Sequence, residues 1–147
     1  MALLENARLD INKKDQYGVN AFWIASFYDH TDAMDFLADQ GINTLSVNQN
    51  GSNALHIAVK RGNINAIRCL IDRNYPLDKT KNNGVSAAGI AAHKGFLHIL
   101  QLLHNSGADL SLSNPQGIGP LYLAMRQKKR DCAVYLIRSG AKCVLEG

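Results

Sequence analysis

The chain has 147 residues, of which 46% are hydrophobic and 19% are charged, and its formal net charge is +4. This composition is typical of an ordinary folded domain and excludes a disordered chain. No apolar run approaches the roughly 20 residues that span a bilayer, and the first residues lack the basic start and apolar stretch of a signal peptide. We therefore expect a protein of the cytoplasm or nucleus without a transmembrane segment.

Four columns of residues recur at a step of 33. Their members are Gly18, Gly51, Gly84 and Gly117; Ala25, Ala58, Ala91 and Ala124; Leu37, Leu70, Leu103 and Leu136; and Gly41, Asn74, Gly107 and Gly140. A fixed period of this size indicates small structural units that stack on one another. The columns divide the chain into a remnant at residues 1–14 and four units at residues 15–47, 48–80, 81–113 and 114–147.

Each unit predicts the same local structure. A turn rich in Asn, Gln, Gly and Lys leads into a short helix that carries the alanine of the second column. After a brief break, apolar residues spaced three or four apart, such as Leu97, Leu100 and Leu103, predict a second helix with one buried stripe. Gly107 and its column equivalents end this helix, because Gly and Asn accept a left-handed backbone most easily. A lone unit cannot bury its stripe, so we expect an all-α stack.

The ends and the third unit depart from this pattern. Residues 1–14 look like the closing part of an earlier unit, which suggests a piece of a longer array. In the third unit Ala88 and Gly89 replace two large residues, so either a neighbour fills that space or the unit is less stable. The fourth unit is charged between Arg126 and Asp131, which fits a C-terminal capping unit, although apolar residues nearby leave room for a further unit or domain.

The sequence lacks a recognisable catalytic or metal-binding constellation. Its five histidines show no i, i+4 pair beside an acidic residue, and it has no phosphate-binding loop or nucleophile elbow. Cys69, Cys132 and Cys143 have no paired spacing, and we interpret them as small hydrophobic residues in a reducing compartment. We therefore expect no enzyme activity, no cofactor and no small-molecule substrate.

The opening of each unit resembles the ankyrin-repeat pattern G-x-T-P-L-H-x-A. The second unit reads Gly51-Ser52-Asn53-Ala54-Leu55-His56-Ile57-Ala58, and the segment from Gly95 to Asp109 is similar to the second half of the pattern. The resemblance covers nearly the whole chain. It implies an all-α ankyrin-repeat solenoid, in which helix pairs are joined by β-hairpin-like turns, and a non-catalytic module that binds another protein.

The resemblance also implies a binding face. In ankyrin arrays the partner usually lies against the concave side, which the loop tips and the ends of the first helices form. The matching residues here are Gln16, Tyr17, Gln49, Asn50, Asn82 and Asn83 at the tips, and Phe27, Tyr28, Lys60, Arg61, His93, Lys94, Arg126 and Gln127 at the helix ends. They pass from aromatic to basic along the array, which fits a partner with an acidic segment. Alternatively, Phe27 or Tyr28 packs under the N-terminal segment and the basic residues form a solvated face.

Two contexts for such a module stay open. It is either the recognition domain of a larger scaffold, channel or regulatory protein, or a free-standing regulator that inhibits a partner enzyme such as a kinase. The mild basic excess is spread over turns and helices without an aromatic–basic platform, which argues against nucleic acid as the partner. In ankyrin arrays an asparaginyl hydroxylase can also act in an L-x(5)-D-φ-N setting, which Leu4, Asp10, Ile11 and Asn12 match, so Asn12 is a candidate hydroxylation site.

Overall fold

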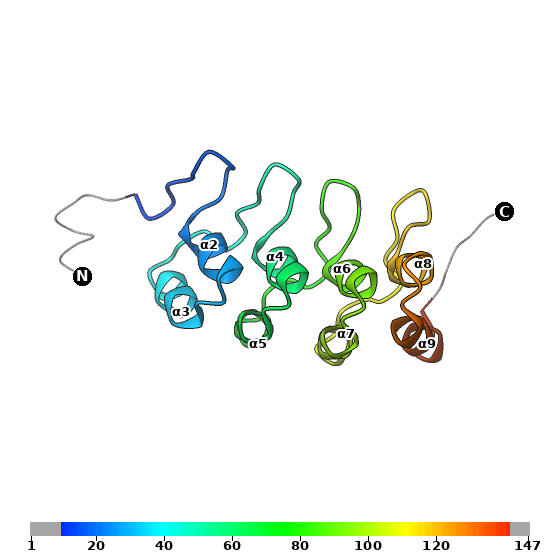
Figure 1. Cartoon of the computed structure of the whole chain (residues 1–147). Coiled ribbons are helices and arrows are strands. Elements are labelled where there is room, and N and C mark those ends of the chain that lie inside the picture. Colours follow the sequence, from blue (N-terminus) through cyan, green and yellow to red (C-terminus); the bar gives the residue numbers. More distant parts are fainter. Residues whose placement is uncertain (1–9, 142–147) are drawn as a thin grey trace.

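The computed structural model describes residues 10–141, and within this range the chain forms eight helices in four successive pairs (Figure 1). The pairs are α2 (Ala21–Phe27) with α3 (Thr31–Asp39), α4 (Ala54–Arg61) with α5 (Ile64–Asp72), α6 (Ala87–Lys94) with α7 (Leu97–Asn105), and α8 (Pro120–Arg126) with α9 (Arg130–Arg138). The first helices form one row, the second helices form another, and the loops project beyond the first row (Figure 1). The predicted all-α solenoid is confirmed.

The first helices begin at residues that suit a helix N-terminus. Side chains at Asn20, Asn53 and Ser86 accept hydrogen bonds from the backbone N–H three residues later. Such bonds satisfy one of the free N–H groups at the start of a helix. Helix α8 uses Gly119 and then Pro120, whose missing N–H costs nothing at the first helical position.

The second helices end as the sequence predicts. The column Gly41, Asn74, Gly107 and Gly140 has φ values of 85°, 58°, 102° and 80°, and each of these residues lies two positions after the end of a second helix. A left-handed residue at this place turns the chain away from the helix and lets its N–H groups bond the last helical carbonyls. Because glycine occupies three of the four places, the turn is made there without a steric penalty.

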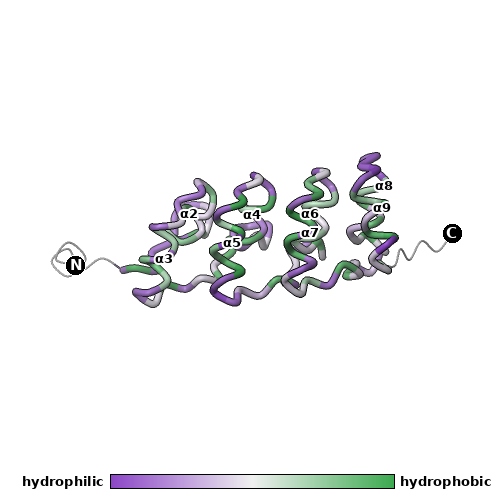
Figure 2. The backbone as a smooth tube through the Cα atoms, turned by 90° about the horizontal axis from the view of Figure 1, so that it is seen from below, coloured by the Kyte–Doolittle hydropathy of each residue, from purple (hydrophilic) through white to green (hydrophobic). Residues whose placement is uncertain are grey.

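The core lies between the two rows of helices. Ala58, Ala91 and Ala124 are fully buried in the first helices, where a small side chain lets neighbouring units approach closely. In the second helices Leu70, Leu103 and Leu136 are fully buried, whereas Leu37 at one end of the array is half-buried. Figure 2 views the array from the side of the second helices, where hydrophobic and hydrophilic residues are interspersed along each helix, as expected for helices with one buried stripe.

Helix α6 is complete despite Gly89. All residues from Ala87 to Ala92 are buried, and the helix contacts both α4 and α8. A Cβ atom added to Gly89 would lie 2.9 Å from Val85 Cγ1 and 3.4 Å from Leu123 Cδ1. These two neighbours therefore occupy the space beside the glycine, which is the first of the two alternatives that the sequence left open.

The four projecting loops share one hairpin-like turn. In each, the residue of the column Asp15, Asn48, Lys81 and Asn114 donates its backbone N–H to the carbonyl oxygen four residues later, over 2.9 to 3.1 Å. Between residues 10 and 141 the loops form no strand, and they contain one isolated antiparallel bridge, between Thr80 and Ser86. None of the described helices is both long and apolar enough to cross a bilayer.

Candidate functional site

The predicted contact residues lie at the tips of the projecting loops and at the C-terminal ends of the first helices. Phe27, Lys60, Arg61, His93, Lys94 and Arg126 belong to the last turns of α2, α4, α6 and α8, and Tyr28 and Gln127 follow directly. Gln16, Tyr17, Gln49, Asn50, Asn82 and Asn83 lie at the loop tips. Phe27 is half-buried, and all the others are exposed. Two hollows on this face bring loop and helix residues together.

The aromatic hollow is a space of about 410 Å³ at the first unit. Its walls are Asp15, Tyr17, Val19, Trp23, Ile24, Phe27, Tyr28, Asn48, Gln49 and Asn50. Tyr17 and Tyr28 are the accessible rings, with 56% and 57% of their surfaces exposed. The predicted aromatic end of the binding face is therefore a concave surface with two exposed tyrosines.

The rings at the base of the aromatic hollow hold one another in place. Trp23 stacks on Phe27 with 5.8 Å between ring centroids, and Phe27 meets Tyr28 edge to face at 4.8 Å. The Trp23 Nε1–H donates to the carbonyl oxygen of Ser52 over 2.9 Å, which fixes the indole against the second unit. Half-buried aromatic side chains of this kind present a rigid apolar surface.

Arg61 is part of the same cluster. Its guanidinium carbon lies 4.0 Å from the centroid of the Phe27 ring, a cation–π contact between the second and first units. One face of each side chain is therefore used inside the molecule. The sequence predicts Phe27 and Arg61 as separate partner contacts. In the structure they pack on each other, so only the outer surface of the pair can meet a partner.

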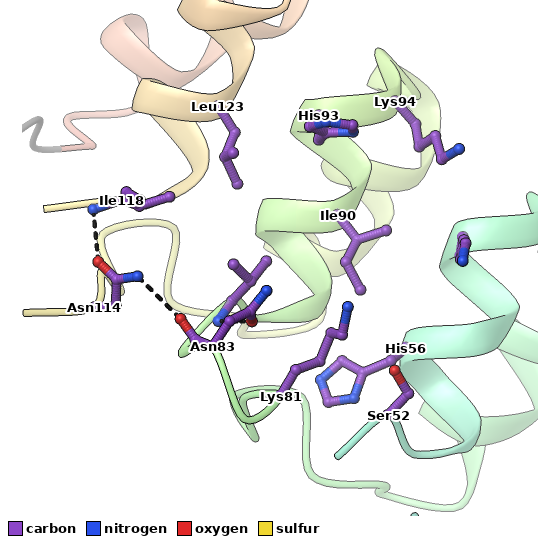
Figure 3. A pocket seen from close by; sticks show the side chains of 12 residues that line it. Ser52, His56, Lys81, Asn83, Ile90, His93, Lys94, Asn114, Ile118 and Leu123 are labelled. Atoms are coloured by element: carbon purple, nitrogen blue, oxygen red, sulfur yellow. Dashed lines mark hydrogen bonds between the residues drawn. The ribbon is translucent and has the colours of Figure 1, made fainter. Parts of the chain in front are cut away.

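The basic hollow is a space of about 420 Å³ between the second, third and fourth units (Figure 3). Its walls are Ser52, His56, Lys60, Lys81, Asn83, Val85, Ile90, His93, Lys94, Asn114, Ile118 and Leu123. Three lysines line it, no carboxylate is among these residues, and Val85, Ile90, Ile118 and Leu123 form an apolar wall. The hollow thus combines positive charge with apolar surface.

Lys81 is the residue of this hollow that sequence reasoning missed. The other members of its column, Asp15, Asn48 and Asn114, each accept two hydrogen bonds from N–H groups of their own turn. Lysine has no acceptor, and the Lys81 side chain instead extends beside His56 toward Ile90 (Figure 3). Burial and the nearby charge of Lys60 lower the pKa of Lys81. Comparing the column across units could have identified it.

The tip asparagines of the third unit have a structural role as well. Asn82 donates its side-chain N–H to the Gln49 carbonyl over 2.9 Å, and its backbone N–H to the Asn50 carbonyl over 3.0 Å. Asn83 accepts a bond from the Asn114 side chain over 2.9 Å (Figure 3). Neighbouring loops are therefore joined.

Five of the predicted residues line neither hollow: Gln16, Arg61, Asn82, Arg126 and Gln127.

The thiols of the described residues are held in their protonated form. Burial, and then the hydrogen bond to Asp35, raise the pKa of Cys69 to about 11. Burial also raises the pKa of Cys132, which is almost fully enclosed. A protonated thiol is a poor nucleophile and a poor metal ligand. Residues 10–141 contain no group of three or more His, Cys, Asp or Glu side chains arranged to hold a metal ion, and Cys143 lies outside the described range.

Asn12 connects the turn before the first projecting loop to the end of the first unit. Its side-chain oxygen accepts a hydrogen bond of 2.7 Å from the Asn43 backbone N–H, while the residue itself is exposed. Asp10 caps the same turn by accepting from the Asn12 N–H over 2.9 Å. The asparagine is thus accessible but already bonded, and Leu4 of the predicted motif lies outside the described residues.

The comparisons with known proteins agree with this geometry. A family model described as ankyrin repeats (3 copies) matches residues 1–80 and 70–146. A comparison with curated proteins gives no match. The two matches cover nearly the whole chain, and the helix pairs repeat at the same 33-residue step as the sequence columns. The chain therefore belongs to the ankyrin-repeat family.

Proposed function

We propose that the chain is a non-catalytic module that binds a partner protein through the concave face, with an acidic segment of the partner on its basic half. Ankyrin repeats are in general protein-interaction modules. The observation that supports this face is the pair of hollows, one aromatic and one basic, on the same side of the array. Exposed tyrosines beside basic residues have the composition of a binding surface.

The two halves of the face have different tasks in this proposal. Tyr17 and Tyr28 accept an apolar part of the partner on the rigid surface formed by Trp23 and Phe27. Lys60, Lys94 and their neighbours attract carboxylates, and because they are solvated, they contribute more to the rate of association and to specificity than to affinity.

The test is affinity purification from the native cell with three baits: the natural chain, a concave variant and a control. The concave variant carries Tyr28→Ala, Lys60→Glu and Lys94→Glu, and leaves Arg61 in place because it stacks on Phe27. The control carries Arg68→Glu and Arg138→Glu, the same reversal of charge on the exposed surface of the second helices. We expect partners that the control retains and the concave variant loses. Partners retained equally by all three baits would contradict the proposal.

The same surface serves either context of the module. As a recognition domain in a larger scaffold, channel or regulatory protein, it leaves the activity of a captured partner unchanged. As a free-standing inhibitor, it lowers the activity of a partner enzyme such as a kinase at stoichiometric amounts. An activity assay of the captured partner with the purified chain separates these roles. In either role we propose that the chain acts in the cytoplasm or the nucleus.

We also propose that Asn12 is a substrate for an asparaginyl hydroxylase. Its exposure supports this, since the enzyme must reach the side chain. Its bond to Asn43 has to open first, so we expect slow modification. Mass spectrometry after incubation with such an enzyme should show the added mass of one oxygen atom on Asn12, and an unmodified peptide would refute the proposal.

A further inference from the structure

The third unit departs from the repeat at Lys81, which lines the basic hollow, and at Gly89, which lies against two residues that line it. Lys81 replaces the Asp or Asn that fixes the turn in the other three units, and Gly89 replaces the large residue of the column Trp23, His56 and Tyr122. Trp23 and His56 line the aromatic and the basic hollow respectively, so this column faces the concave side. Both departures therefore act on the same space.

The first departure places a positive charge where the turn needs an acceptor. The third loop lacks the two side-chain bonds that Asn48 and Asn114 accept in their turns. Instead, the Asn83 side-chain oxygen accepts one hydrogen bond from the Val85 N–H. The half-buried ammonium of Lys81 has Lys60 close enough to repel it, and no carboxylate lines the hollow. A lysine at this position is thus unfavourable for the free protein.

The second departure, Gly89, leaves room for the apolar residues that line the hollow. A Cβ atom at position 89 would already lie 2.9 Å from Val85 Cγ1, so a side chain as large as Trp23 or Tyr122 there would displace Val85 and Leu123. Together with Ile90 and Ile118, they form the apolar wall of the hollow, and Figure 3 shows Ile90 beside the Lys81 side chain. The result is a positive charge and an apolar surface within one space of about 420 Å³.

We propose that this hollow is the specificity site for an extended segment of a partner protein that carries an Asp or Glu next to an apolar side chain. The carboxylate pairs with Lys81, with Lys60 and Lys94 nearby, and the apolar side chain packs on Val85, Ile90 and Leu123. A bound carboxylate supplies the negative charge that the hollow lacks. The inference rests on the proposed function, because it specifies the partner chemistry of the same face.

The experiment uses the full chain and a displayed library of random linear peptides. Peptides selected on the natural chain are synthesised, and their affinities are measured by fluorescence anisotropy for the natural chain and for four variants. One of them, Tyr28→Ala, changes the aromatic hollow and leaves the basic one intact. Lys81→Asn restores the turn residue of the column, Lys81→Arg keeps the charge, and Lys79→Asn removes an exposed charge two residues away that does not line the hollow.

We expect the selected peptides to share an acidic residue beside an apolar one. Lys81→Asn should weaken their binding by about ten- to a hundredfold, the usual value of a hydrogen bond to a charged group, while Lys81→Arg and Lys79→Asn leave it nearly unchanged. Lys81→Asn should also raise the midpoint temperature of unfolding, because the turn regains its acceptor. Weaker binding together with higher stability rules out unfolding as the cause.

The opposite outcomes separate this inference from the proposed function. Peptides that bind Lys81→Asn as well as the natural chain, but lose affinity for Tyr28→Ala, would overturn the inference and keep the concave face as the binding surface. Peptides insensitive to both changes would overturn both. A single-stranded oligonucleotide that displaces the peptides and binds more tightly than any of them would overturn the choice of a protein partner.

Discussion

His56 shows how much one side chain contributes to the structure of its unit. Its Nδ1 accepts a hydrogen bond of 3.0 Å from the Asn53 N–H, and its own N–H donates to the Asn53 side chain over 2.9 Å. The Nε2–H of the same ring donates to the Lys79 carbonyl over 2.8 Å. One buried residue thus caps α4 and holds it against the segment that leads into the third unit.

The neutral ring of His56 predicts a dependence of stability on pH. Burial lowers the pKa of His56 below its ordinary 6.5, and Lys81 acts in the same direction. As the pH falls through 6.5, the unfolded chain gains a proton that the folded chain does not bind. The free energy of unfolding should therefore fall at acidic pH, by up to about 1.4 kcal/mol per pH unit for this proton.

Urea unfolding measured at about pH 7.5 and about pH 5 checks this prediction, since both values lie around the ordinary histidine pKa. His56→Asn should reduce the difference between the two conditions, while the control His98→Asn, at an exposed position on α7, should keep it. An unchanged difference in the His56 variant would contradict the assignment.

The start of α8 differs from the starts of the other first helices, because its N-cap residue, Gly119, has no side chain to cap the helix. Gly119 has an extended backbone with φ of −134°, so its conformation does not require glycine. The reason lies in its surroundings, because an added Cβ would lie 2.7 Å from the Leu112 carbonyl oxygen and 3.0 Å from Ser113 Cβ. The loop before α8 therefore packs directly on this glycine.

Gly119→Ser should consequently destabilise the protein, although serine caps helices better than glycine by a few tenths of a kcal/mol. We expect a loss of about 1–3 kcal/mol in unfolding free energy, as for overpacked sites. The reciprocal change Ser86→Gly, at the start of α6, should cost only a few tenths of a kcal/mol. Urea titrations of both variants provide the measurement, and a Gly119→Ser chain as stable as the natural one would refute the explanation.

The sequence predicted the elements well because they depend on local signals. The apolar spacing of the second helices and the glycines that end them are properties of a few neighbouring residues, and the structure confirms both. The contact between Arg61 and Phe27 could not be predicted, since it depends on the offset between adjacent units. Lys81 was predictable in principle, because it differs from Asp15, Asn48 and Asn114 in its column, but the direction of its side chain into the basic hollow depends on how the units pack.

For the whole molecule, burial depends on the place of a unit in the array as much as on the residue. The column Ser26, Val59, Ala92 and Met125 lies in the first helices, and its first three members are fully buried. Met125 in the last described helix pair has 52% of its surface exposed. Because each unit in a solenoid is covered by its neighbours, a position that is core in one unit is surface in another.

The same substitution in this column should therefore have opposite consequences. Val59→Lys places an ammonium in a site without water, and we expect a loss above about 4 kcal/mol or complete unfolding. Met125→Lys should change the unfolding free energy by no more than about 0.5 kcal/mol, since the new side chain is solvated. Thermal and urea unfolding followed by circular dichroism compare the two variants. Similar losses in both would mean that another part of the chain covers Met125, and the dependence of burial on array position would then fail for this column.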